Sequence, residues 1–386
     1  MAICSDLDET PTRYVYYETA KFLNTNQMTS MGPGVNLEVG NTIYFDMPPG
    51  QFSYWNTDDT GRSMVEQLVR SGHIDCLHSY GDNATLRCHA EKAIDALIMK
   101  GCKLEVWIDH AVSPSNLGSD IMCGQGDIPT SQAYHADLTC KFGIRFVWLG
   151  RVTSVIGQDS NRSLKGIWNN ADKIASSLTI PKEFAKGWLA RMGSAKYAMH
   201  QSNALMRKKR LRDGHEVYEF MRCNPHWKGV DKGETADGIA QILVPEILNR
   251  LVERGGVCIL YTHLGKISGR TVAFKPAVIE AFKALSEYVS NGKILVTTTS
   301  RLLKYKLAVK ELSLSNGILE NGLYSIQIDS RYPDGLDGLT LYTAEPERTV
   351  VTINDRKVDG LRCNPLDRTG RRSVSLPWRK LEFPLL

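Results

Sequence analysis

Apolar, strand-like runs alternate with amphipathic helical patterns over roughly the first 310 residues, and this alternation constrains the fold most. The strand-like runs are at residues 1–5, 42–45, 74–78, 104–108, 144–149, 217–221, 257–261 and 294–297. The helical patterns are at residues 14–23, 61–71, 84–100, 181–192, 236–254, 276–289 and 300–309. Seven or eight strands separated by helices favour a parallel barrel or a doubly wound sheet. Of the two, we expect an α/β fold with a distorted, TIM-like (β/α)7-8 barrel.

The C-terminal part of the chain has a different pattern. From residue 323 onward, β-branched and aromatic segments at 324–328, 339–343 and 349–353 are separated by turn sequences such as Asn354-Asp355. No helical period is visible there. We therefore predict two domains, a β/α barrel over residues 1–315 and a small β-rich domain over residues 323–386.

The charge of the chain does not point to a polyanionic partner. The 386 residues include 47 Lys and Arg against 42 Asp and Glu, a formal net charge of +5. A balance this small does not indicate nucleic-acid binding. The basic residues are concentrated only at 207–212, Arg-Lys-Lys-Arg-Leu-Arg. We expect this run to be a solvated helix end or loop, with contact to a phosphate, a sugar nucleotide or an anionic glycan as the alternative.

The N-terminal segment and the cysteines indicate the cellular compartment of the protein. The chain enters an apolar strand at once, without a charged leader followed by a long apolar segment, and no stretch approaches the length that crosses a bilayer. Nine cysteines are scattered along the chain, and none has Cys-x-x-Cys spacing. Such usage is typical of a reducing compartment. We therefore expect a cytoplasmic protein with no transmembrane segment.

Candidate catalytic side chains follow several of the predicted strands. In a β/α barrel, the carboxyl ends of different strands meet at one mouth, so residues far apart in sequence converge there. We therefore expect one pocket to contain the polar residues that follow the first, third, fourth and a late strand: Asp6, Asp8, His78, Asp82, Asp109, His110 and His263. Neighbours at a strand end point in different directions. Of Asp109 and His110, we expect His110 to enter the pocket and Asp109 to bind the scaffold.

The stretch at residues 72–82, Gly-His-Ile-Asp-Cys-Leu-His-Ser-Tyr-Gly-Asp, resembles the second motif of the polysaccharide deacetylase family. In that family Gly-His-Glu-Ile-Gly-x-His is followed by Ser or Thr and, four residues after the last His, by another His; this chain has Asp82 there. Asp6-Leu7-Asp8 resembles the family's paired acidic turn with a leucine inserted, and residues 259–265 resemble its late Leu-x-His motif with one extra residue. The family's Arg-x-Pro-Tyr motif is not evident, and Arg145, Arg151 and Arg222 are candidates for its cation.

The resemblance covers roughly the first 300 residues and implies a divergent metal-dependent hydrolase on a distorted barrel. It implies removal of an N- or O-linked acyl group from a carbohydrate in the synthesis of a bacterial surface polysaccharide of the O-antigen kind. Zn²⁺ or another divalent metal lowers the pKa of bound water toward ~7 and polarises an acyl carbonyl. We assign Asp8, His78 and Asp82 as metal ligands, Asp6 as general base and His263 as general acid, with the roles of Asp6 and Asp8 open to exchange.

The remaining candidates concern the substrate. We expect a carbohydrate, with a nucleotide or lipid carrier as an option, and no nucleic acid. His110 is a further catalytic candidate, and the predicted substrate-binding residues are His135, Trp148, Arg151 and Arg222. Each candidate also has a structural alternative: Asp82 suits the N-cap of the helix that follows it, and a histidine such as His263 is as often satisfied by the scaffold.

Two other functions are compatible with the same residues. The turn Asp6-Leu7-Asp8-Glu9-Thr10 also resembles the Asp-x-Asp-x-Thr turn of haloacid-dehalogenase-like phosphatases, in which the first Asp attacks phosphorus and Mg²⁺ assists. No acidic pair follows in a suitable place, so this function ranks second. A third possibility is a glycan-binding barrel with a degraded site.

Overall fold

A curled, mostly parallel sheet of ten strands forms the centre of the structure, a computed structural model that describes all residues except 161–166, 169–172, 226–232, 268–273, 368 and 385–386. The strand order is β8-β11-β12-β1-β4-β5-β6-β7-β10-β9. From one edge to the other, these strands are Val152–Thr153, Arg222–Cys223, Ile259–Thr262, Ala2–Ser5, Gly40–Ile43, Ile74–His78, Val106–Ile108, Phe146–Trp148, Glu216–Phe220 and Met206–Arg210. β9 and β10 pair antiparallel, and the other neighbours in the sheet are parallel.

The expected α/β class is present, but the closed barrel is not established. Among the described residues the sheet ends at β8 and β9, so it is a half-barrel with two edges. Residues 294–297, predicted as a strand, contribute only a single parallel bridge between Thr297 and Ala2. Six of the parallel strands, β1, β4, β5, β6, β7 and β11, are buried along their whole length, as is typical of a parallel sheet covered on both faces.

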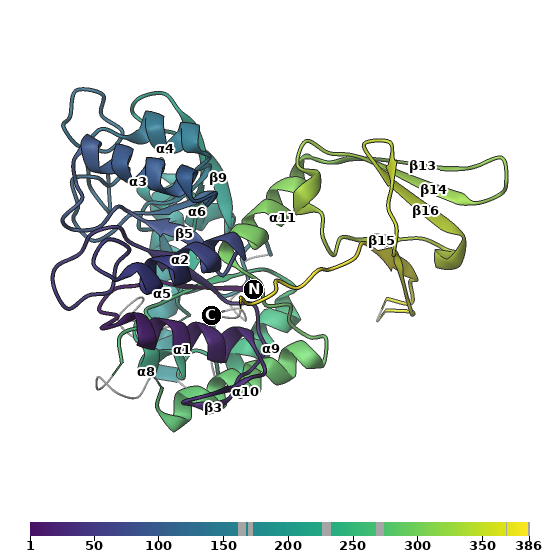
Figure 1. Cartoon of the computed structure of the whole chain (residues 1–386). Helices are drawn as coiled ribbons and strands as arrows, with labels where there is room; N and C mark the ends of the chain where they lie inside the picture. Colours follow the sequence, from purple (N-terminus) through teal and green to yellow (C-terminus); the bar gives the residue numbers. More distant parts are fainter. Residues whose placement is uncertain (161–166, 169–172, 226–232, 268–273, 368, 385–386) are drawn as a thin grey trace. The chain divides into compact units, whose positions relative to one another are not determined.

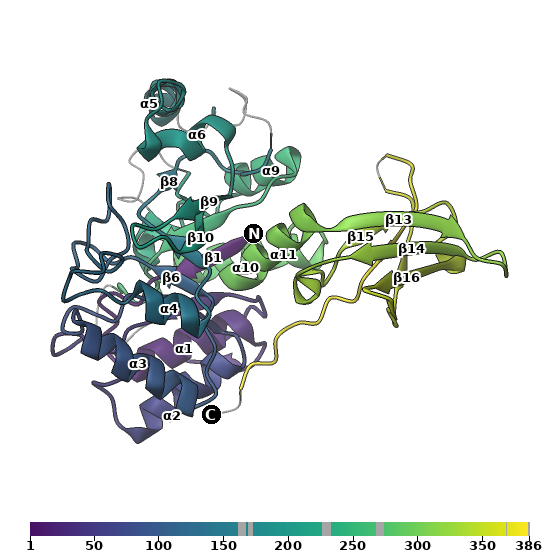
Figure 2. The same ribbon diagram turned by 90° about the horizontal axis from the view of Figure 1, so that it is seen from above.

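Helices connect the parallel strands and lie around the outside of the sheet (Figures 1 and 2). They are α1 (Arg13–Asn24), α2 (Asp59–Arg70), α3 (Arg87–Met99), α4 (Ala136–Phe142), α5 (Lys173–Arg191), α6 (Ala198–Ser202), α8 (Ala236–Ile239), α9 (Pro245–Arg254) and α10 (Pro276–Ser290), with a 3₁₀ turn η2 at Ala195–Tyr197. The helix α11 (Thr299–Glu311) follows them in the chain. A short hairpin of β2 (Met28–Thr29) and β3 (Gly32–Pro33) follows α1. The sequence shows how several helices begin and end: Asp58 accepts a hydrogen bond from the Gly61 N–H at the start of α2, and α9 ends at the left-handed Gly255.

Two predicted helices differ from the observed helices at a proline. The sequence predicts one helix over 236–254, but α8 ends at Ile239 and α9 begins at Pro245, because proline favours the first turn of a helix. The sequence predicts a helix that starts at Pro181, whereas α5 begins at Lys173 and contains Pro181 in its interior. Pro181 is exposed, so water is available to the carbonyl that loses its partner.

Most of the basic run at 207–212 is a strand and not a helix end or loop. Met206–Arg210 form β9, the antiparallel edge of the sheet, and only Leu211 and Arg212 lie in the turn that leads to β10. Arg207 and Arg210 pair with Glu219 and Glu216 of β10 at 2.7 and 3.2 Å. Charged side chains on an edge strand discourage pairing with another chain, which is a structural reason for this composition.

The residues divide into two units, Met1–Ser300 with Leu381–Leu386 and Arg301–Lys380. This division differs from the predicted domains 1–315 and 323–386 at both ends. Most of α11 belongs to the second unit, because Tyr305, Ala308 and Val309 pack into its apolar cluster. The chain then returns to the first unit, where the Leu381 N–H donates a hydrogen bond to Glu38 at 3.0 Å.

The second unit is built mainly of strands. β13 (Ser313–Ile318), β14 (Tyr324–Asp329), β16 (Thr349–Ile353) and β17 (Arg356–Lys357) form one sheet, and β15 (Thr340–Tyr342), β19 (Ser373–Ser375) and β18 (Arg362–Asn364) form another. Two 3₁₀ turns, η3 (Pro333–Gly335) and η4 (Pro346–Arg348), lie between strands. None of the described helices is long and apolar enough to span a membrane.

Candidate metal centre

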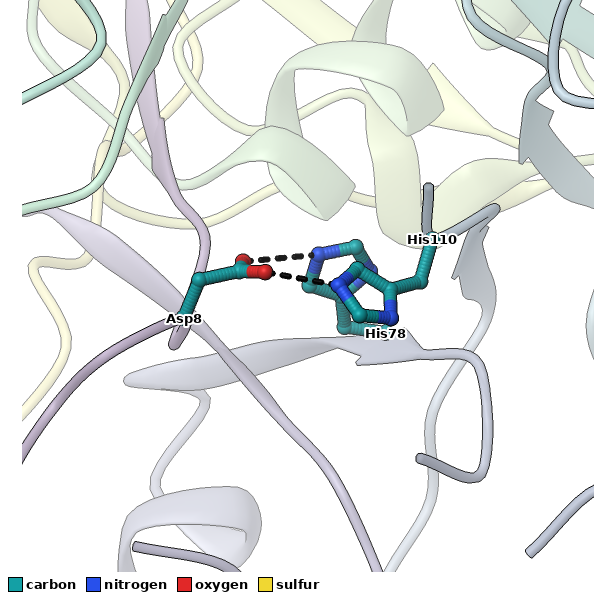
Figure 3. Close-up of side chains that lie close together, drawn as sticks. All are labelled: Asp8, His78 and His110. Carbon is teal, nitrogen blue, oxygen red and sulfur yellow. Dashed lines mark hydrogen bonds and ion pairs between the residues drawn. The ribbon is translucent and has the colours of Figure 1, made fainter. Parts of the chain in front are cut away.

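Three histidine rings face the carboxylate of Asp8, which follows β1. The Nε2 atom of His110 lies 2.7 Å from Oδ1 of Asp8, and the Nε2 atoms of His78 and His263 each lie 3.2 Å from Oδ2. Figure 3 shows His78 and His110 next to each other, both facing the oxygens of this carboxylate. These four residues, which we name the Asp8 centre, come from the carboxyl ends of β1, β5, β6 and β12. Parallel strands bring those ends to one edge of the sheet, so residues 255 positions apart become neighbours.

The other ring nitrogen of each histidine is held by the protein. A carbonyl oxygen only accepts, so Nδ1 of His78 donates to the carbonyl of Ile108 at 3.2 Å, and Nδ1 of His263 donates to that of Glu234 at 2.7 Å. Nδ1 of His110 lies 3.0 Å from a carboxylate oxygen of Asp82. A proton held on Nδ1 leaves the lone pair of Nε2 directed at Asp8, which is the arrangement of histidines that ligate metals.

This arrangement needs protons or a metal ion between the ring nitrogens and the carboxylate. Unprotonated Nε2 atoms and a carboxylate are all acceptors, so they attract one another only when protons or a metal ion lie between them. Burial raises the pKa of Asp8, but hydrogen bonds from His110, His263 and His78 outweigh burial and hold it well below its usual value. Burial likewise lowers the pKa of His110 and His263, but Asp8 outweighs it and raises both.

The spacing of the donor atoms suits zinc. Bonds of about 2.0–2.1 Å in a tetrahedral zinc site separate neighbouring ligand atoms by about 3.4 Å. The distance of 3.2 Å from Asp8 to His78 and to His263 is close to this value, whereas His110 lies nearer to Asp8, at 2.7 Å. Two overlapping groups of residues each have their ligand atoms within 4.8 Å of one another. One group is Asp8, His78 and His110, and the other is Asp6, Asp8 and His263. Mixed imidazole and carboxylate donors favour zinc or a similar transition metal over Mg²⁺.

The backbone around the Asp8 centre has an unusual conformation. Among the described residues, eight non-glycine residues have positive φ, and five of these are Asn or Asp, which tolerate it. The other three are Glu9 (φ 56°), Ser79 (φ 48°) and Ala111 (φ 40°). They directly follow Asp8, His78 and His110. Strained backbone of this kind is concentrated at functional sites, and here it turns the chain immediately after each candidate ligand.

Asp6 lies beside the Asp8 centre but is bound by an arginine. Arg222, the first residue of β11, donates to Oδ2 and Oδ1 of Asp6 at 2.6 and 2.9 Å, and both side chains are buried. Nε2 of His78 lies 3.5 Å from Oδ2 of Asp6. Burial raises the pKa of Asp6, but Arg222 and His78 outweigh it and hold the pKa below its usual value. Asp6 is therefore ionised at neutral pH.

Aromatic rings enclose the centre. Tyr44, buried directly after β4, stacks on the ring of His78 with centroids 4.7 Å apart and contacts the edge of the His110 ring at 5.1 Å. Burial, followed by the charges of Asp8 and Asp6, raises the pKa of Tyr44 well above its usual value, so its hydroxyl stays protonated. Sequence analysis did not single out Tyr44, because the strand predicted at 42–45 includes it, whereas the observed β4 ends at Ile43.

The predicted ligand Asp82 lies behind His110 rather than among the ligand atoms that surround Asp8. Its carboxylate faces Nδ1 of His110, the nitrogen turned away from Asp8. Gly81, directly before Asp82 in the loop after β5, has a positive φ of 103°. Asp82 is not an N-cap either, because Leu86 is the N-cap of α3. Asp109, as a scaffold residue, accepts hydrogen bonds from Trp107 and from the Leu117 and Gly118 N–H groups.

The four predicted substrate-binding residues are buried, and their polar atoms bond to other groups of the protein. His135 lies 2.7 Å from the Ser115 carbonyl and 2.8 Å from the Thr139 hydroxyl. Trp148 donates to the Arg151 carbonyl at 2.8 Å.

The two arginines of this set are also paired with protein groups. Arg151 forms ion pairs with Asp120 at 2.8 Å and Glu219 at 2.7 Å. Arg222 binds Asp6 and lies over the Trp148 ring at 4.2 Å. The geometry therefore gives all four a role in positioning the scaffold and no exposed surface for substrate.

Comparisons with known proteins give no family: no family model matches the chain, and no curated protein or solved structure matches it significantly.

Proposed function

We propose that the protein is a metal-dependent hydrolase whose cation is held by Asp8, His78 and His110. The observation that carries this proposal is the convergence of three imidazole Nε2 atoms on one carboxylate, at 2.7, 3.2 and 3.2 Å, with the opposite nitrogens of His78 and His263 bound to carbonyls. His110 replaces Asp82 in the ligand set predicted from sequence. Zn²⁺ is the cation that this donor set favours.

The neighbouring residues supply acid–base chemistry. A bound divalent cation lowers the pKa of water toward ~7 and polarises a carbonyl. Asp6, kept ionised by Arg222, accepts a proton from the attacking water as general base. His263, whose Nδ1 donates to the Glu234 carbonyl at 2.7 Å, would carry a second proton on Nε2 and deliver it to the departing amine or alkoxide as general acid.

The substrate class follows from the resemblance of residues 72–82, 6–8 and 259–265 to the polysaccharide deacetylases. We infer an acylated carbohydrate, N- or O-linked, from the synthesis of a bacterial surface polysaccharide. The second ligating imidazole that the family places four residues after the first is supplied here by His110, and the family's arginine corresponds in role to Arg222. The half-barrel sheet is compatible with the distorted barrel of that family.

Metal content and acyl release test the proposal together. Purified protein should contain about one zinc per chain and release acetate from acetylated chito-oligosaccharides. His110→Ala and Asp8→Asn should lose both properties. His215→Ala is the matched control, because His215 is exposed and forms an ion pair with Asp213 at 2.9 Å, away from the Asp8 centre. Protein that binds no divalent metal, or a His110→Ala variant with unchanged zinc content and activity, would refute the proposal.

The phosphatase remains the second candidate because Asp6 and Asp8 lie side by side after β1. Its nucleophilic aspartate would have to be Asp6, which is bidentate to Arg222, and its Mg²⁺ would lie among imidazoles, which that ion disfavours. Magnesium-dependent turnover of 4-nitrophenyl phosphate, lost in Asp6→Asn, would favour it. A pure glycan-binding protein would bind acetylated oligosaccharide without turning it over.

A further inference from the structure

Helix α5 shows the reverse of the amphipathic pattern that is usual for a helix at a protein surface. Such a helix normally buries an apolar stripe and exposes its polar face. In α5, the polar residues Ser176, Thr179 and Glu183 are buried, with exposed fractions of 3, 5 and 0 %. The large apolar residues Ile174, Leu178, Phe184 and Trp188 lie on the other side and are exposed.

The exposed residues form one continuous stripe along the helix. Their separations of three or four positions place them within about a third of the helix circumference. We name this set the α5 stripe: Ile174, Leu178, Pro181, Phe184, Trp188 and Met192, the last directly after the helix. Phe184 is 58 %, Trp188 60 % and Ile174 77 % exposed. Exposed apolar surface of this extent and order marks an interaction site.

The buried polar face fixes the orientation of α5. Glu183 forms an ion pair with Lys186 at 2.8 Å and lies 3.6 Å from Nδ1 of His200. The Lys186 ammonium also donates to the Val152 carbonyl of β8 at 3.4 Å. These contacts hold the helix against the edge of the sheet, so the α5 stripe faces outward as part of the folded structure.

The charged residues on α5 and directly after it are mostly basic. Residues 173–200 contain five Lys or Arg and a single acidic residue, Glu183, which is buried. Lys173, Arg191 and Lys196 are exposed along and beside the helix. An apolar stripe with Trp and Phe, flanked by cations, is the pattern of helices that lie in the interface of an anionic bilayer. A second copy of the chain would bring the same positive charges together, which disfavours a symmetric dimer.

We propose that the α5 stripe docks on the surface of an anionic lipid bilayer. Phe184, Trp188 and their apolar neighbours enter the headgroup region, and Lys173, Arg191 and Lys196 contact lipid phosphates. This partner is additional to the proposed hydrolysis and needs no metal, so zinc content and lipid binding report on the two proposals separately.

Vesicle sedimentation of the full chain tests the proposal. Wild-type protein should sediment with vesicles of phosphatidylcholine mixed with phosphatidylglycerol, more weakly with phosphatidylcholine alone, and less as salt is raised. Phe184→Ser/Trp188→Ser should lower the partition coefficient at least about tenfold. Ile98→Ser/Met99→Ser on α3 is the matched control, because Ile98 and Met99 are 60 and 77 % exposed. Thermal unfolding of both double variants checks that they are folded.

Three results would overturn the proposal. One is wild-type protein that stays in the supernatant with the mixed vesicles, and another is equal vesicle binding by the two double variants. The third is a wild-type dimer in solution that Phe184→Ser/Trp188→Ser converts to a monomer, since that result assigns the α5 stripe to a second copy of the chain.

Discussion

Asp6 and Arg222 are 216 positions apart and form a buried bidentate ion pair, with the guanidinium nitrogens 2.6 and 2.9 Å from the carboxylate oxygens. The pair joins β1 to β11, two strands that do not neighbour each other, because β12 lies between them. It also places a fixed positive charge behind the carboxylate that we assign as general base.

Replacing Arg222 should therefore affect both stability and the Asp6 pKa. Arg222→Met leaves a buried carboxylate without its partner, and we expect the free energy of unfolding to fall by about 3–5 kcal/mol. The pKa of Asp6 should rise, because burial then acts without Arg222. Urea unfolding measures the first effect, and the acidic limb of the activity profile measures the second. Asp6→Asn/Arg222→Met should be more stable than Arg222→Met; equal stability of the two would contradict the ion pair.

Asp82 should support the metal site without being a ligand. Its carboxylate lies 3.0 Å from Nδ1 of His110, and loss of such an outer partner typically lowers metal affinity 10–100-fold. We therefore expect Asp82→Asn to weaken zinc binding by about that factor, whereas Asp8→Asn abolishes it. Competition with a chelator measures both affinities. Asp95→Asn, at an exposed carboxylate on α3, is the control and should bind zinc as wild type does. Zinc binding by Asp82→Asn as weak as that of Asp8→Asn would restore Asp82 to the ligand set.

The backbone after His110 should store strain that glycine relieves. Ala111 has φ 40°, a conformation that costs a non-glycine residue about 1 kcal/mol or more. We expect Ala111→Gly to raise the free energy of unfolding by about 0.5–1 kcal/mol, despite the greater flexibility of the unfolded chain. Ala185→Gly, at an exposed position within α5, should instead lower it by about 1 kcal/mol. Chemical denaturation compares the two, and destabilisation by Ala111→Gly would show that the turn is unstrained.

His135 should make the protein sensitive to acid. Burial lowers its pKa to about 4, against about 6.5 in an unfolded chain. Between these values the unfolded state binds a proton that the folded state does not, so stability is complete above pH 6.5 and falls as the pH is lowered toward 4. The full loss from this residue is about 3 kcal/mol. Urea unfolding of wild type and His135→Gln at several pH values measures this loss, since the variant lacks the imidazole. If the stability of both proteins fell in parallel as the pH is lowered, His135 would not be the cause.

Local sequence patterns predicted much of the secondary structure. The strand at 74–78 and the strand at 349–353 have the bounds predicted for them, and α10 begins at the predicted Pro276. The polar residues after the strands were found for the same reason: a buried strand that ends in Asp or His is visible without tertiary information. Asp8, His78 and His263 were singled out in this way, and the structure brings them within 3.2 Å contacts.

The sequence by itself determined which segments are strands and helices and which strand ends carry acids and imidazoles. The reason is that the spacing of apolar residues along the chain follows the period of the secondary structure that buries them. Only the tertiary structure decided that His110 faces Asp8 while Asp82 stands behind it, and that Arg222 neutralises Asp6. Side-chain direction after a strand depends on single backbone angles, such as those at Ser79 and Ala111, and on partners up to 255 positions away, which no local pattern encodes. The same applies to α5, whose pattern shows two faces but not which of them the fold buries.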